Sequence, residues 1–337
     1  VEQAINISQK IGDKKLEADS ADKLADVFGE MGKYQDAISV SEKAIEHYQL
    51  LDDLPGKIRA YCHLGFYYYR SGNNELTRAF GEQAVELAKH LGDPILYGSA
   101  LNILSMSEAD LAKQINILQM AVESFEVSRA YGRQATITYN LGLSYLLLGL
   151  YNRAAELIEN ACNFARKTNT LDSFMLYSLF LAFACIRQNE LEKANHTLSE
   201  FLSLVEQIGQ QGGMMPIYHL FMGMYLCEKA EYKRALSHLD QAYEGFKGLP
   251  QQANVKSIFG EVFLHQGKVV EALESSKKAI TLIEEFHGAQ SILFPQWIWW
   301  HHYKVLTANK SLICDPNEMW KALDQAFNLM IHSIRTL

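Results

Sequence analysis

A pattern centred on a small residue returns about every 40 residues along this chain, and it constrains the fold more than any other feature. Each copy has an apolar residue, a small residue, a bulky residue three places later, a turn and then an alanine. Clear copies lie at residues 23–37, 63–79, 140–155 and 258–272. Self-similarity at a fixed period of this length predicts a stack of identical supersecondary units rather than one globular core.

The repeats can be aligned position by position. The small residue falls at Ala25, Gly65, Ser105, Gly142, Ala182, Gly223 and Gly260. The turn residue seven places later is Gly32, Gly72, Ala112, Gly149, Asn189, Ala230 or Gly267. Small residues allow two helices to cross closely, and glycine adopts the left-handed conformation that ends a helix. Apolar residues spaced as Leu141, Tyr145 and Leu148 indicate helices rather than strands. Repeat 3 regains the alanine only at Ala121, which predicts a shorter turn between its two helices.

This pattern resembles the tetratricopeptide repeat, a helix–turn–helix unit, over roughly residues 20–306. Extra residues in 10–18, 50–60 and 90–100 are similar to the long-repeat subclass. That subclass is common in bacterial regulators resembling the maltose-operon activator and in signalling ATPase–cyclase proteins. The resemblance implies an all-α fold, a right-handed superhelical solenoid of antiparallel helix pairs with about seven repeats and a C-terminal capping pair.

The expected organisation has three parts. Residues 1–18 are expected to be part of a helix of a preceding repeat, because the chain begins at Val1 inside such a pattern. Residues 19–290 are expected to form the solenoid, with repeats starting near 19, 59, 99, 136, 176, 217 and 254. Residues 291–337 are expected to cap it as a helix pair, with Asp315 or Asn317 as the helix cap and Ala322 and Ala326 packed inward. The segment from Pro295 to Leu306 also resembles the array ends of the same bacterial signalling proteins.

Composition and motifs narrow the function classes. A net charge of −8 without a basic run argues against nucleic-acid binding. There is no apolar run of membrane-spanning length, so we expect no membrane partner. Five scattered cysteines indicate reduced thiols and a cytoplasmic location. We find no catalytic or phosphate-binding motif, and the adjacent His301 and His302 point about 100° apart on a helix, so we expect no enzyme activity, metal or cofactor.

In such an array the first helix of each repeat lines the concave groove. The groove-facing positions of repeat 1 are acidic and include Asp19, Asp22, Asp26 and Glu30, whereas those of repeats 4 to 6 are apolar. A protein or peptide partner, or the protein's own upstream domain, would bury the apolar stripe. The predicted groove residues are Phe66, Tyr69, Tyr139, Asn140, Leu143, Leu146, Leu179, Phe183, Arg187, Leu220, Phe221 and Met224.

Three alternatives remain open for the apolar stripe. It is an open groove, it is inter-repeat packing, or it is covered by the ends of the array or by a second copy. Asn140 either hydrogen-bonds a ligand backbone or joins two helices. If the groove is open, Phe183→Asp with Leu220→Asp should abolish partner binding and leave helicity unchanged. The sequence therefore predicts a protein-binding scaffold, the interaction or sensor region of a larger bacterial signalling protein. The alternative is a regulatory domain that acts in cis on an ATPase, cyclase or DNA-binding domain.

Overall fold

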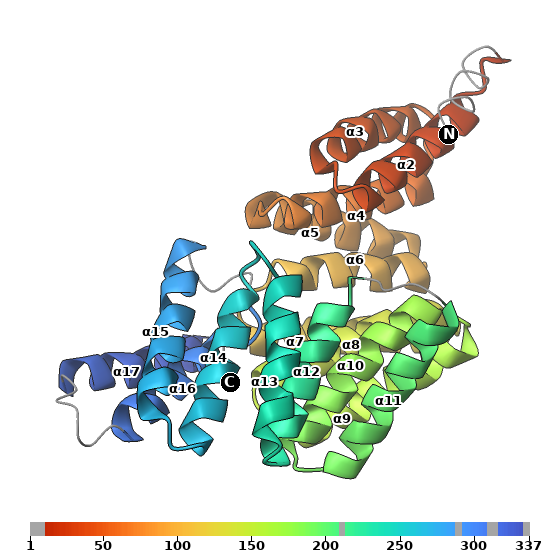
Figure 1. The fold of residues 1–337 in the computed structure, drawn as a ribbon. Coiled ribbons are helices and arrows are strands. Elements are labelled where there is room, and N and C mark those ends of the chain that lie inside the picture. Colours follow the sequence, from red (N-terminus) through yellow and green to blue (C-terminus); the bar gives the residue numbers. More distant parts are fainter. Residues whose placement is uncertain (1–10, 209–212, 287–291, 309–315, 333–337) are drawn as a thin grey trace. The chain divides into compact units, whose positions relative to one another are not determined.

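A computed structural model describes residues 11–208, 213–286, 292–308 and 316–332, and these fold into helices packed as antiparallel pairs (Figure 1). The chain divides into two compact units. Unit 1 runs to Leu141 and unit 2 begins at Gly142, so the boundary falls inside helix α8 (Tyr131–Leu147).

Unit 1 contains the first repeats of the pattern. Its helices are α2 (Lys14–Glu30), α3 (Tyr34–Leu50), α4 (Leu54–Arg70), α5 (Asn74–Leu91), α6 (Pro94–Met106), α7 (Leu111–Ser128) and the first part of α8. Each helix from α2 to α6 packs against the next one, and α4 also contacts α2 and α6. The first helices of successive repeats therefore lie side by side and form one face.

Unit 2 continues the alternation. Its helices after α8 are α9 (Tyr151–Lys167), α10 (Leu171–Arg187), α11 (Leu191–Ile208), α12 (Met215–Glu228), α13 (Tyr232–Gly245), α14 (Gln252–His265), α15 (Val269–Glu285), α16 (Pro295–Ala308) and α17 (Pro316–His332). Helices α10, α12, α14 and α16 contact one another in sequence order and form the corresponding face.

The predicted turn residues end the first helix of their repeats. Positive φ angles occur at Gly32, Gly72, Gly149, Asn189, Ala230 and Gly267. Alanine and asparagine adopt this left-handed conformation at a cost that glycine avoids, so the turn geometry overrides residue preference at Asn189 and Ala230. Ala112 is the exception, because it lies buried inside α7.

The prediction for repeat 3 was wrong in its physical detail. Its turn covers residues 107–110 and is longer, not shorter, than the three-residue turn at 31–33. Helix α6 ends at Met106, directly after Ser105, whereas α2 continues five residues beyond Ala25. Asp110 then caps α7 by accepting hydrogen bonds from the backbone N–H groups of Ala112 and Lys113. The fourth residue of α7 is Gln114, where α3 has Ala37, and Ala121 of α7 corresponds to Ala44 of α3.

Small residues allow close helix crossings, as expected. A Cβ added at Gly142 would lie 2.6 Å from Ile158 Cγ1, and one at Gly223 would lie 2.8 Å from the Leu239 side chain. Both distances are shorter than ordinary carbon–carbon contacts, so only glycine fits without movement of α9 or α13.

The C-terminal helices close the apolar core of unit 2. Ala322 and Ala326 of α17 are buried against a cluster that includes Ile298, Trp299 and Leu306 of α16, so the expected inward packing is confirmed. Asn317 lies in the first turn of α17, while Asp315 falls outside the described residues.

Candidate functional site

An open groove with a volume of about 790 Å³ runs across the face of unit 1. Helices α2, α4, α6 and α8 supply its walls. Its polar lining residues include Asp26, Glu30, Arg59, His63, Arg70, Ser99, Asn102, Arg133 and Thr136, and its apolar ones include Phe66, Leu96 and Ile103. The groove thus presents both signs of charge beside apolar surface.

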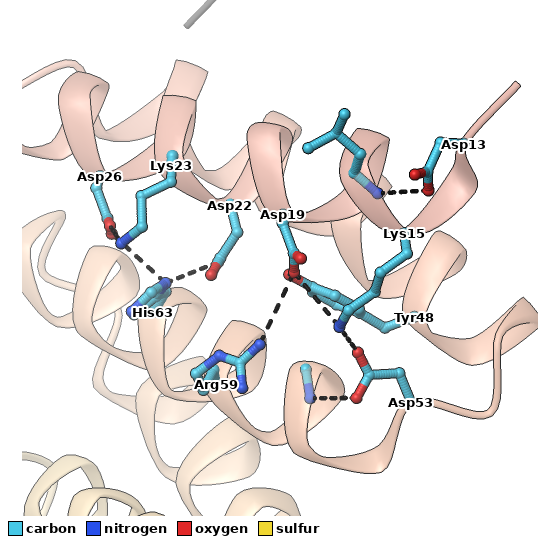
Figure 2. Close-up of polar contacts among 12 residues, drawn as sticks. Asp13, Lys15, Asp19, Asp22, Lys23, Asp26, Tyr48, Asp53, Arg59 and His63 are labelled. Carbon is cyan, nitrogen blue, oxygen red and sulfur yellow. Dashed lines mark hydrogen bonds and ion pairs between the residues drawn. The ribbon is translucent and has the colours of Figure 1, made fainter. Parts of the chain in front are cut away.

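Acidic side chains of α2 meet His63 of α4 along one side of this groove. His63 Nδ1 lies 2.8 Å from Asp22 Oδ1 and 3.5 Å from Asp26 Oδ1. The Tyr67 hydroxyl donates to Asp26 Oδ1 at 3.2 Å, and Lys23 reaches the same carboxylate at 3.0 Å. Figure 2 shows His63 pointing between Asp22 and Asp26.

The pKa of His63 reflects these contacts. Burial lowers it, but the hydrogen bond and negative charge of Asp22, with Asp26 nearby, outweigh burial and raise the pKa above its ordinary value. Burial raises the pKa of the neighbouring Cys62 thiol to about 12, so this cysteine is a neutral, inert part of the groove wall near pH 7.

A second polar group lies one helical turn earlier on α2. The Tyr48 hydroxyl donates to Asp19 Oδ1 at 2.8 Å, and Arg59 lies 3.9 Å from the same oxygen (Figure 2). Lys15 bridges Asp19 and Asp53, and Asp53 also caps α4 by accepting from the Gly56 N–H. The loop carboxylate at Asp53 is thus a structural cap.

The other wall of the groove carries arginine side chains without a paired carboxylate, and two asparagine amides. Arg133 of α8 donates to Ser99 Oγ at 2.6 Å, and the Asn140 amide donates to Asn102 Oδ1 at 3.0 Å. Within the described ranges, no carboxylate lies within 4 Å of the Arg133 or Arg70 guanidinium. Arg70 instead lies over the rings of Tyr34 and Phe66.

The apolar residues predicted for the groove occupy a different environment in unit 2. Leu146, Leu179, Phe183, Leu220, Phe221 and Met224 are all at least 94% buried. We call this set the unit 2 groove. Phe183 is 1% exposed because residues 292–297, here called the plug, lie over it: its ring stacks on Phe294 at 4.8 Å and lies 5.5 Å from Trp297. This arrangement corresponds to the third alternative above, in which the end of the array covers the apolar stripe.

The remaining predicted residues are spread between the two units. Phe66 is half-buried and lines the unit 1 groove, whereas Tyr69 is 42% exposed and is not one of the lining residues. Tyr139 is buried and Leu143 is half-buried. Arg187 places its guanidinium 4.0 Å above the Trp297 ring. Whether any of these residues contacts a partner stays a prediction.

Sequence reasoning missed the lining residues of repeats 3 and 4, above all Ser99 and Arg133. The repeat was expected to start near residue 136, but α8 already begins at Tyr131. Helical spacing carried the missing signal, because Arg133 precedes Asn140 by two turns and so lies on the same face.

His301 and His302 contact different partners, as expected for adjacent residues that point about 100° apart on a helix. His301 Nδ1 lies 2.8 Å from Ser257 Oγ and its Nε2 lies 3.5 Å from Glu261, whereas His302 contacts Ser276 at 3.0 Å. Burial lowers the pKa of His301 to about 4. Burial opposes ionisation of Glu261, but the basic groups His301 and Lys304 lower its pKa to about 2. The contacts of Ser257 and Glu261 with His301 and Lys304 join α14 to α16, and His301 is buried among them.

Two further searches covered the described part of the chain. No cluster of three or more His, Cys, Asp or Glu side chains there is arranged to hold a metal ion. None of its helices combines the length and apolar character needed to cross a bilayer.

Comparisons with known proteins agree on the architecture. Residues 16–90 match the tetratricopeptide-repeat family model. A Rap protein complexed with Competence and Sporulation Factor superposes with a TM-score of 0.70 at 13% identity, covering 94% of this chain and 88% of that chain. Aspartyl phosphate phosphatase F from Bacillus subtilis gives 0.64 at 15% identity, with 84% and 75% covered.

A more distant match is a Signal Transduction ATPase with Numerous Domains that has a tetratricopeptide-repeat sensor, from Pyrococcus horikoshii. Its TM-score is 0.50 at 12% identity, covering 97% of this chain and 43% of that chain. A sequence comparison with curated proteins found no match. At identities of 12–15%, these structural matches show a shared fold only. Residues 16–90 match the tetratricopeptide-repeat model, and the same helix pairing in both units gives the chain the fold of a tetratricopeptide-repeat solenoid.

Proposed function

We propose that this chain is a protein-interaction scaffold that binds a peptide or protein segment in the unit 1 groove. The observation that carries this proposal is the open groove of about 790 Å³ across α2, α4, α6 and α8. A repeat array offers a long concave surface of this kind, and peptide recognition uses such surfaces.

The groove lining supports a segment that carries acidic and apolar side chains. Arg70 and Arg133 lack a carboxylate within 4 Å among the described residues, so an acidic ligand group gains a charge-assisted hydrogen bond there. The half-buried Phe66 offers apolar contact area between them. The Asn102–Asn140 pair carries amides that can donate to and accept from a peptide backbone.

A panned peptide library tests this proposal. Random peptides displayed on phage are selected on the whole chain, and a selected peptide is then titrated. Arg70→Glu with Arg133→Glu should weaken its binding at least about tenfold, which corresponds to the loss of about 1.4 kcal/mol. The matched control, Lys43→Glu with Lys89→Glu, makes the same charge change on exposed positions of α3 and α5 and should leave binding unchanged. Equal affinities for both double variants would contradict the assignment of the groove.

The wider role that we propose is that of an interaction or sensor region in a larger bacterial signalling protein. The sensor array in the Pyrococcus horikoshii protein supports such a role by analogy of fold. The buried, unpaired thiols of Cys62, Cys162, Cys185 and Cys227 support a cytoplasmic location, where cysteines stay reduced.

A second candidate role is regulation in cis of a linked ATPase, cyclase or DNA-binding domain. The plug favours this role, because it is a covalently linked segment that already occupies a groove of this chain. The two roles differ in one measurement. A form of the protein that carries such a domain should bind the selected peptide at least about tenfold more weakly than the isolated array if regulation is in cis. Equal affinities would favour a separate partner.

A further inference from the structure

The plug enters the unit 2 groove with two aromatic side chains that are three residues apart. Phe294 stacks on Phe183 with an interplanar angle of 4°, and Trp297 lies 5.9 Å from the Tyr151 ring. The Arg187 guanidinium covers Trp297 at 4.0 Å. Each aromatic side chain of the plug therefore has its own contact surface, as anchor residues of a bound peptide do.

Polar bonds hold the plug to helices that are distant in sequence. The Gln296 side-chain amide donates to the Leu147 carbonyl at 3.2 Å, across a sequence separation of 149 residues. The Asn254 side-chain amide donates to the Leu293 carbonyl. This bond is made to a backbone carbonyl, which every residue has. A segment with a different sequence can therefore accept the same hydrogen bond from Asn254.

The plug fits the groove imperfectly. Asn254 Oδ1 and Arg187 Nε are buried without a hydrogen-bond partner among the described residues, and Asn254 is only 9% exposed. Phe294 adopts φ of +51°, which is costly for a residue with a bulky side chain. Pro295 has no backbone N–H, so it cannot donate a hydrogen bond to a buried acceptor in the groove. A cavity of about 20 Å³ remains beside Asn254, Ser257 and His301.

We infer that the unit 2 groove is a second binding site, specific for a segment with two aromatic side chains three residues apart, and that the plug is its internal occupant. A partner segment with this spacing and an N–H donor for Asn254 Oδ1 displaces the plug. The same contacts that bury Phe294 and Trp297 would then bury the partner's aromatic side chains. This site is separate from the unit 1 groove and does not depend on the function proposed for it.

Competition between plug and partner sets the apparent affinity. A ligand that binds only when the plug has left is weakened by the fraction of molecules in which the groove is filled. Removal of the plug's two aromatic side chains should therefore strengthen binding of a peptide with the plug's own sequence.

The test uses the whole chain and a fluorescein-labelled peptide with the sequence of residues 292–298. Phe294→Ala with Trp297→Ala should bind this peptide at least tenfold more tightly than the unchanged chain. The matched control, Phe327→Ala with Trp300→Ala, also removes one phenylalanine and one tryptophan, but both are exposed, so affinity should equal that of the unchanged chain. A peptide with alanine at both aromatic positions should not bind.

Circular dichroism of each variant decides between a site and a fixed core. If the Phe294→Ala, Trp297→Ala variant keeps its helicity and binds the peptide no better than the unchanged chain, the inference is overturned. It is also overturned if this variant loses the helicity of unit 2, since the plug would then be core. Gln296→Ala gives an independent result, because it removes only the bond to Leu147. It should raise peptide affinity severalfold, and an unchanged affinity in the folded variant contradicts displacement.

Discussion

Unit 1 has a polar face with an open groove, whereas the equivalent face of unit 2 is apolar and filled by the plug. In unit 1 the first helices contact one another through pairs such as Asp22–His63 and Ser99–Arg133. In unit 2 the equivalent contacts are aromatic, as between Phe180 and Phe221. Exposed charges stay hydrated in an open groove, but an apolar face of similar extent is stable only when something covers it.

The two units also differ in how their helices begin. Side-chain caps accept backbone hydrogen bonds at the start of α2 and of α4 to α7, from Asp13, Asp53, Asn73, Asp93 and Asp110. Helices α9, α10 and α12 to α15 have no such cap. Unit 1 therefore relies more on local hydrogen bonds, and unit 2 relies more on apolar packing between distant residues. This difference can be tested by changes that affect one unit and leave the other unchanged.

The largest effect is expected from charges placed in the unit 2 groove. Phe183→Asp with Leu220→Asp puts two carboxylates at positions that are at most 3% exposed, so unit 2 should lose its cooperative fold. The expectation of unchanged helicity applied to an open groove, whereas both side chains are buried in the structure. Tryptophan fluorescence reports the effect, because residues 1–141 contain no tryptophan.

The matched control for these charges lies in unit 1. Phe66→Asp with Tyr69→Asp changes one half-buried and one exposed side chain, and should cost at most about 2 kcal/mol. If urea unfolding gives similar losses for both double variants, the contrast between the two units is wrong.

A smaller effect is expected from acid, with opposite signs in the two units. His301 has a folded pKa of about 4, below the ordinary 6.5, so its contribution is present above pH 6.5 and is lost as pH falls toward 4. The loss is about 3 kcal/mol at most. His63 has a raised pKa, so its contribution is fully present below pH 6.5 and is lost as pH rises through the folded pKa.

Hydrogen exchange between pH 8.5 and 4.5 measures both signs in one sample, because the contribution of His63 is lost as pH rises above 6.5 and that of His301 is lost as pH falls below 6.5. Amides of α14 should lose protection as pH falls, while those of α4 should not, after correction for the intrinsic exchange rate. His301→Gln should reduce the acid sensitivity of α14, whereas His196→Gln, at an exposed position of α11, should not. Parallel loss of protection in α4 and α14 would contradict the assigned signs.

The smallest effect is expected at a helix cap. Asp93 accepts from the N–H groups of Ile95 and Leu96, so Asp93→Ala should destabilise α6 by about 1 kcal/mol. Lys268 occupies the equivalent position before α15 but makes no side-chain cap bond, so Lys268→Ala should cost a few tenths of a kcal/mol. If urea unfolding shows the same loss of unfolding free energy for the two variants, the claim that unit 1 depends more on local caps than unit 2 is wrong.

The sequence predicts much of the local structure, because the repeat is a local signal. The positions of Gly32, Asn189 and Ala230 in their turns follow from the 40-residue period, as does the close crossing at Gly142. The early end of α6 was missed because it depends on the cap at Asp110 rather than on the period. The filling of the unit 2 groove could not be predicted, because the Gln296–Leu147 bond joins residues that no periodic pattern relates.

Hydroxyl-radical footprinting of Phe66 and Phe183 tests most directly that one groove is open and the other is filled. Both residues lie on first helices of their repeats and have the same intrinsic reactivity, so their oxidation rates compare the solvent access of the two grooves. We predict ready oxidation of Phe66, protection of Phe183 in the unchanged chain, and oxidation of Phe183 once Phe294 and Trp297 are replaced by alanine. Oxidation of Phe183 at the rate of Phe66 in the unchanged chain would contradict this account.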